Sequence, residues 1–161
     1  MNSAEPGPHP HRRDPSVGSS PIGRLHHVVI DCPHPTELAQ FYSALLGLPV
    51  TYSSDDWVVV AESDTTSGIA FQLAPDHQPP EWPNPDHPQQ IHLDVMVDDL
   101  ASAERRVVAL GARHLRHSPG SSPVYADPAG HPFCLIPRPQ WAPPIDTWES
   151  DVREPSKSEH A

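Results

Sequence analysis

Two histidines, His27 and His92, open two similar stretches of this sequence. Each is followed by a run rich in aliphatic residues and then by an amphipathic pattern, which ends at Gly47 in the first stretch and at Gly111 in the second. Histidine binds metal ions and exchanges protons near neutral pH. A single strand histidine is often held by hydrogen bonds alone, but two at equivalent positions of a duplicated unit predict a shared cleft.

Acidic and sulfur-bearing side chains accompany the second histidine. Asp94 lies two positions after His92, so on a strand both side chains face the same way. Asp94 is therefore a candidate general base, although it can equally orient His92 or pair with an arginine. Cys134 is a candidate ligand or nucleophile, but its neighbours Phe133 and Leu135 are more typical of a small buried residue.

Three further side chains are candidates for contact with a ligand. In residues 68–74 (GIAFQLA) small residues alternate with large ones, and Gln72 is the polar member of the small set. We therefore expect Gln72 to point into a space beside the strand. Trp57 and Tyr125 are expected to wall a pocket for an organic ligand, with packing in the core as the alternative for both.

Hydrophobic periodicity predicts the elements that must position these side chains. A helix-spaced apolar stripe within residues 35–46 predicts a helix that ends at Gly47. Asp98 or Asp99 is expected to cap a second helix that ends at Gly111. Each half is then one βαβββ unit. The predicted strands are residues 24–31, 50–53, 57–61 and 68–74 in the first half, and residues 90–97, 112–115, 123–126 and 131–136 in the second.

Charge and cysteine content limit the classes of function. The chain has 161 residues, a formal net charge of -11 and two cysteines. An acidic chain is poorly suited to bind nucleic acid or an anionic membrane surface, and no apolar run approaches the length of a spanning helix. Two cysteines do not make a disulfide framework, and the first residues show no secretory signal. We therefore expect a cytoplasmic protein.

The 23 prolines are unevenly placed and suggest the boundaries of the domain. Residues 1–21 have almost no large apolar side chains and are predicted to form a disordered tail. Residues 140–161 are predicted to form a second tail, docked through WAPPIDTW and then loose. The predicted body is residues 22–139, with modules at about 22–74 and 89–137 and a proline-rich crossover at 75–88.

The order of these motifs resembles the vicinal oxygen chelate superfamily, with its glyoxalase, bleomycin-resistance and extradiol-dioxygenase members. The matching segments are HVVID and FYSALLGL in the first half, and HLDVMVDDL and VYADPAGHPF in the second. The resemblance spans about residues 22–137. It implies an α+β fold in which two tandem βαβββ modules form an open curved sheet around a central cleft. It also implies a homodimer, because relatives commonly dimerise.

Enzymes of this superfamily bind one divalent metal ion in the cleft, through residues on the first and last strands of each module. Carried over onto this sequence, those positions are His27, Gln72, His92 and Cys134. Cys134 stands where the family pattern has glutamate, so the set has lost its carboxylate ligand. The resemblance thus implies a softer site for zinc, iron, nickel or manganese, or no metal at all, and argues against strict glyoxalase I chemistry.

Three functions follow as hypotheses. The first is binding of a small organic molecule between the modules without turnover, because the carboxylate ligand is missing. The second is a divergent metal-dependent lyase, isomerase or oxygenase that uses the strand histidines, with Asp94 as base. The third is an acidic protein-interaction module. Recovery of an unchanged ligand would favour the first, and metal-dependent consumption of a ligand, lost in His92→Ala, would favour the second.

Overall fold

The computed structural model describes residues 23–116 and 122–145 of the chain. The predicted tail 1–21, the last residues of the predicted docked segment WAPPIDTW and the predicted loose segment after it lie outside the described residues. The predicted α+β class and the order of two βαβββ modules are confirmed. The elements of the described part are β1 (His27–Cys32), α1 (Pro35–Leu46), β2 (Val50–Ser53), β3 (Trp57–Val60), β4 (Gly68–Leu73), β5 (Leu93–Val97), α2 (Leu100–Ala109), β6 (Arg113–Arg116), β7 (Val124–Ala126) and β8 (Pro132–Pro137).

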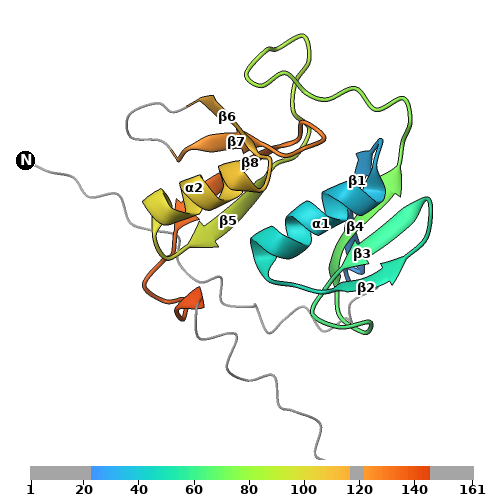
Figure 1. The fold of residues 1–161 in the computed structure, drawn as a ribbon, viewed down its shortest axis with the longest axis horizontal. Coiled ribbons are helices and arrows are strands. Elements are labelled where there is room, and N and C mark those ends of the chain that lie inside the picture. The colour runs from blue at the N-terminus through green and yellow to red at the C-terminus, as the bar shows by residue number, and fades with distance from the viewer. Residues whose placement is uncertain (1–22, 117–121, 146–161) are drawn as a thin grey trace, which may run out of the picture.

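Each module forms a four-stranded mixed sheet (Figure 1). The strand order is β1-β4-β3-β2 in the first sheet and β5-β8-β7-β6 in the second, so the first and last strands of each module are neighbours. These neighbours pair in parallel, with His27 opposite Gly68 and Leu93 opposite Phe133. β1 and β5 therefore lie at sheet edges, and the crossover arches from β4 to β5.

The helix ends follow from local chemistry. Pro35 occupies the first turn of α1, where its missing N–H costs no hydrogen bond. Gly47 ends α1 in the left-handed conformation, at φ 68°, as the sequence predicts. Of the two candidate caps, Asp99 is the one that caps α2, because its carboxylate accepts a 2.6 Å hydrogen bond from the backbone N–H of Ser102. Neither helix of the described part is long and apolar enough to span a bilayer.

One hydrophobic core joins the two modules. The ring of Phe41, on α1, contacts Phe133 of β8 edge to face, with 5.9 Å between the ring centroids. Tyr42, the next residue of α1, stacks on Phe71 of β4 at 5.3 Å. Val107 of α2 belongs to the same core. The modules therefore cannot separate without exposing aromatic surface to water, which the hydrophobic effect opposes.

Two strands begin later than the sequence predicts. β1 starts at His27 rather than at residue 24, and β5 starts at Leu93 rather than at residue 90. The partner strand accounts for the second difference: the residue before Phe133 is Pro132, which has no N–H to extend the ladder. His92 therefore lies just before its strand.

After β8 the chain turns back toward the start of α2. Arg138 forms an ion pair with Asp98, and the backbone N–H of Ile145 donates a 2.8 Å hydrogen bond to Oδ2 of the same carboxylate. Ala142, between them, is buried. These contacts hold residues 138–145 against the second module.

Candidate functional site

Three chemically reactive side chains meet on the second sheet. Asp94 of β5 lies opposite Cys134 of β8 in the parallel register, so their side chains share a face. His92 joins them, with 3.7 Å between its Nε2 and Oδ1 of Asp94. The three candidate ligand atoms all lie within 4.8 Å of one another. We call these three residues the His92 cluster.

The donor set of the His92 cluster fits a divalent transition metal. It offers one imidazole nitrogen, one carboxylate oxygen and one sulfur, and three protein ligands with an open side are typical of a catalytic metal site. The side chains of His92 and Asp94 are 44% and 53% exposed, so a ligand could reach the open side. Burial, and then the nearby Asp94 carboxylate, raise the pKa of the Cys134 thiol. Cys134 must therefore release its proton to bind a metal.

His27 lies apart from this cluster in the described chain. Its Nδ1 accepts a 3.2 Å hydrogen bond from the backbone N–H of Gly68, and its ring stacks on His26 at 3.8 Å. Burial, and then the adjacent His26, lower the pKa of His27. His27 lines a shallow hollow on the first sheet together with Trp57. Of the four positions carried over from the superfamily, the structure brings together only His92 and Cys134 within one chain.

Gln72 is displaced along the first sheet. It pairs with Asp31, whereas His27 pairs with Gly68 four residues earlier on the same strand. At about 3.3 Å per residue, Gln72 and His27 are separated by about 13 Å along the strand direction. Cys134 lies opposite the second residue after His92, and Ala70 lies opposite the second residue after His27. Ala70 is therefore the counterpart of Cys134 in the first module, and it is fully buried. Gln72 is exposed and lies beside Trp57.

Tyr125 lies in the hydrophobic core. Val124 shares a face with Cys134, so Tyr125, the next residue of β7, points to the opposite face. It is 1% exposed and packs on Phe133 and His114. For Tyr125 the structure thus favours the alternative reading, packing in the core. Trp57 is half-buried, at the edge of the hollow that His27 lines.

A cavity of about 330 Å³ lies between the modules. Both modules and the crossover line it, and we call it the inter-module cavity. Four histidines contribute to its wall: His77, His87, His92 and His131. Apolar side chains of β1 and of the segment before β5, among them Val29 and Ile91, complete it. His92 is thus shared by the His92 cluster and the inter-module cavity.

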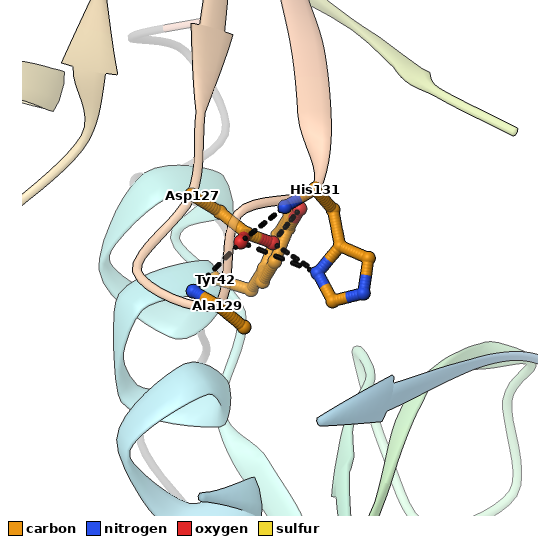
Figure 2. A network of polar contacts seen from close by, with 4 residues as sticks. All are labelled: Tyr42, Asp127, Ala129 and His131. Atoms are coloured by element: carbon orange, nitrogen blue, oxygen red, sulfur yellow. Dashed lines mark hydrogen bonds and ion pairs between the residues drawn. The ribbon is translucent and has the colours of Figure 1, made fainter. Parts of the chain in front are cut away.

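A polar network that the sequence patterns did not predict lies beside this cavity (Figure 2). Asp127 is 4% exposed, and its carboxylate accepts hydrogen bonds from the Tyr42 hydroxyl at 3.0 Å and from the backbone N–H groups of Ala129 and His131, both at 2.9 Å. Nδ1 of His131 lies 3.1 Å from Asp127 Oδ2. The motif DPAGH carries the signal that could have found it, an aspartate and a histidine on one tight turn.

A family model described as a glyoxalase-like domain matches residues 27–136, about two thirds of the chain. The chain belongs to this family. The match covers both βαβββ modules and places the glyoxalase-like domain in the vicinal oxygen chelate superfamily. A search of curated proteins finds no match.

Solved structures of the superfamily share the fold. A glyoxalase/bleomycin resistance protein/dioxygenase family enzyme from Burkholderia phytofirmans PsJN is 15% identical with a TM-score of 0.57, over 71% of this chain and 98% of that chain. The fosfomycin resistance protein FosX from Mesorhizobium loti is 17% identical, with a TM-score of 0.54 over 71% and 90%. The oxidase ChaP-H2 is 19% identical, with a TM-score of 0.51 over 73% and 95%. At these identities the likeness shows the fold alone.

Proposed function

We propose that this glyoxalase-like domain binds a small organic molecule in the inter-module cavity. The observation that carries the proposal is the cavity itself, which has a volume of about 330 Å³ and combines apolar walls with four histidines. Small-molecule sites are typically concave, mostly apolar and equipped with a few polar groups that fix orientation. The family membership supports the proposal, because this fold places its ligand sites between modules.

The proposal is tested by filling the cavity. Ile91 is 62% exposed and lines the cavity, so Ile91→Trp should occlude it without disturbing the core. Aromatic fragments, beginning with 4-nitroanisole, are screened by ligand-observed NMR against the wild type and this variant. We expect binding to the wild type that Ile91→Trp abolishes. Val108→Trp, a control at a 52% exposed position of α2, should bind normally. Equal binding to all three proteins would contradict the proposal.

A metal-dependent reaction is the second candidate, and the His92 cluster is the observation that favours it. His92, Asp94 and Cys134 would hold the ion, and a bound divalent metal would supply a Lewis acid that polarises an oxygen of the ligand. Because His92 also lines the inter-module cavity, a ligand there would lie next to the ion. Asp94, which is 53% exposed, would then act as a metal ligand rather than as the general base that the sequence suggested. Consumption of a ligand only in the presence of metal separates this candidate from simple binding.

We also propose a homodimer. The faces of β1 and β5 that turn away from the core expose Val29 and Met96, at 46% and 38%. Both strands are sheet edges, which proteins usually cover or pair. Sedimentation equilibrium should give twice the chain mass for the wild type and the chain mass for Val29→Glu/Met96→Glu. Val108→Glu, on the exposed side of α2, should leave the mass unchanged, and a monomeric wild type would refute the dimer.

The two free thiols support the proposal of a cytoplasmic location, because reducing compartments keep cysteines unpaired. Fractionation of cells that express the tagged chain tests it, and recovery in an oxidising compartment would oppose it.

A further inference from the structure

His131 lines the inter-module cavity, and one of its two ring nitrogens is in contact with a buried carboxylate. Asp127, on the turn between β7 and β8, has a fully buried carboxylate that lies 3.1 Å from Nδ1 of His131 (Figure 2). The side chain of His131 is 18% exposed and lines the cavity. In Figure 2 the second ring nitrogen, Nε2, points away from Asp127. A buried carboxylate therefore supports a ring that faces a ligand space.

The contact with Asp127 decides which nitrogen carries the hydrogen. A carboxylate only accepts hydrogen bonds, so Nδ1 of His131 must be the N–H of the neutral ring. Nε2 then has a free lone pair. In hydrolases of unrelated fold, a carboxylate bonded to Nδ1–H leaves the lone pair of Nε2 free, and this makes the histidine a proton acceptor. Here it would act on whatever occupies the cavity.

Among the groups packed around His131 in the cavity wall, His131 is the one placed to accept a proton from a ligand. Burial, and then the charge and hydrogen bond of Asp127, raise the pKa of Tyr42 well above its ordinary value, so its hydroxyl stays neutral. The ring of His77 lies 4.7 Å from that of His131, and its buried Nε2 has no hydrogen-bond partner among the described residues. That nitrogen has almost no accessible surface, so a ligand in the cavity cannot reach it as it reaches His131. The other ionisable side chains that line the cavity are Asp31, His87 and His92.

We infer that the inter-module cavity takes a ligand with an acidic hydroxyl and that His131 accepts its proton, with Asp127 as the positioning residue. This inference rests on the proposed binding function of the cavity. In the step, the O–H bond of the ligand breaks and an N–H bond forms at Nε2. The electron pair stays on the ligand oxygen, so no oxidant or reductant is needed. The resulting oxyanion faces an imidazolium that Asp127 neutralises from behind.

A purely structural role of Asp127 and His131 predicts a different result. Asp127 also closes its turn, since its backbone N–H donates a 2.9 Å hydrogen bond to the His131 carbonyl and its side chain accepts from Ala129. If that were the whole role, replacing the His131 ring would alter stability and leave the ionisation of a bound ligand unchanged. The experiment must therefore read the protonation state of the ligand directly.

The experiment uses 4-nitrophenol, whose ionised form has its own visible absorption band, with the full chain at a pH where the free phenol is neutral. We expect the phenolate band to appear on binding to the wild type. In His131→Gln the band should be lost and the affinity should fall about 10- to 100-fold, the loss of a hydrogen bond to a charged group. 4-Nitroanisole, which has no acidic proton, should bind both proteins equally. His34→Gln, a control at an exposed position outside the cavity lining, should keep the band.

Each other result has a defined meaning. A phenolate band that survives in His131→Gln, or a neutral phenol bound to the wild type, would overturn the inference and leave the binding function intact. If neither 4-nitrophenol nor 4-nitroanisole binds the wild type, the proposed function fails and this inference falls with it. For Asp127, nitrogen NMR of the His131 ring should show Nδ1–H in the wild type and loss of that preference in Asp127→Asn. An unchanged tautomer in a folded Asp127→Asn would remove Asp127 from the scheme.

Discussion

The hydroxyl of Tyr42 donates a 3.0 Å hydrogen bond to the carboxylate of Asp127, a residue 85 positions away and in the other module. Tyr42 is 1% exposed and Asp127 is 4% exposed, so water does not compete for this bond. It fixes α1 of the first module against the turn that carries His131 (Figure 2). The helix of one module thus helps to hold a cavity residue of the other.

Tyr42→Phe should therefore destabilise the fold. The change removes one donor from a buried carboxylate, and a lost hydrogen bond to a charged group costs about 1.5–3 kcal/mol. Urea unfolding should show that decrease in the free energy of unfolding. Tyr52→Phe is the matched control, because Tyr52 is 57% exposed and should change stability by less than about 0.5 kcal/mol. Equal effects of the two changes would mean that the Asp127 contact contributes nothing.

Gly68→Ala should be strongly destabilising, because β4 passes close to the end of β3. A Cβ at position 68 would overlap the carbonyl oxygen of Val60 and lie 2.6 Å from Cβ of Ala61. Backbone atoms cannot rotate away, so we expect a cost of at least about 1–3 kcal/mol by thermal or urea unfolding. Gly23→Ala, which has no atom within 4 Å of its added Cβ, should be neutral. A neutral Gly68→Ala would show that this approach relaxes easily.

Stability should fall at alkaline pH because of Cys32. Burial raises the pKa of this fully buried thiol from 9.0 to about 11. The folded state therefore holds the proton more tightly than the unfolded state does. The resulting stability is fully present below pH 9 and is lost as pH rises toward 11, by about 2–3 kcal/mol for a shift of this size. Urea unfolding from pH 8 to 11 measures it.

Two variants test whether Cys32 causes the loss of stability at alkaline pH. Cys32→Ala should flatten the decline between pH 9 and about 10, where Tyr42 and Tyr125, whose pKa values are also raised by burial, still stay neutral in both states. Cys134→Ala should keep most of the decline, since that thiol is only half-buried. An unchanged profile in Cys32→Ala would refute the assignment.

Cobalt should report the His92 cluster directly. Co²⁺ bound by a thiolate has a near-ultraviolet charge-transfer band, so titration of the protein with Co²⁺ should produce it if Cys134 is a ligand. We expect one equivalent to bind, loss of the band in Cys134→Ser, and at least about a tenfold weaker binding in His92→Ala. His87→Ala, which lines the same cavity but lies outside the cluster, is the control. Binding without a thiolate band would exclude Cys134 as a ligand.

Most of the fold could be predicted from the sequence because its signals are local. The alternation in residues 68–74 and the helix-spaced stripe before Gly47 depend on neighbours within a few positions, and the observed β4 and α1 follow them closely. Asp99 as the cap of α2 is equally local. Even the late start of β5 has a sequence signal, Pro132, but only once the pairing of β5 with β8 is known.

The site could be predicted only in part, because it depends on packing between segments far apart in the chain. His92 and Cys134 come together within one module, where Asp94 lies opposite Cys134, and the resemblance to the superfamily had placed both in a single set. His27 bonds to Gly68 within the first sheet, and only the three-dimensional arrangement shows that it lies apart from the cluster on the second sheet. Tyr42 has the spacing of a core residue and Asp127 that of a turn residue, so neither pattern alone reveals the bond between them.

The parallel pairing of each module's first and last strands has a consequence for synthesis on the ribosome. β1 finds its neighbour only when β4 has been translated, and β5 waits in the same way for β8. The first module can then complete its sheet, but Phe41 and Tyr42 keep an aromatic surface uncovered until Phe133 and Asp127 emerge. During that interval the nascent chain carries a site for chaperones that the finished protein has buried.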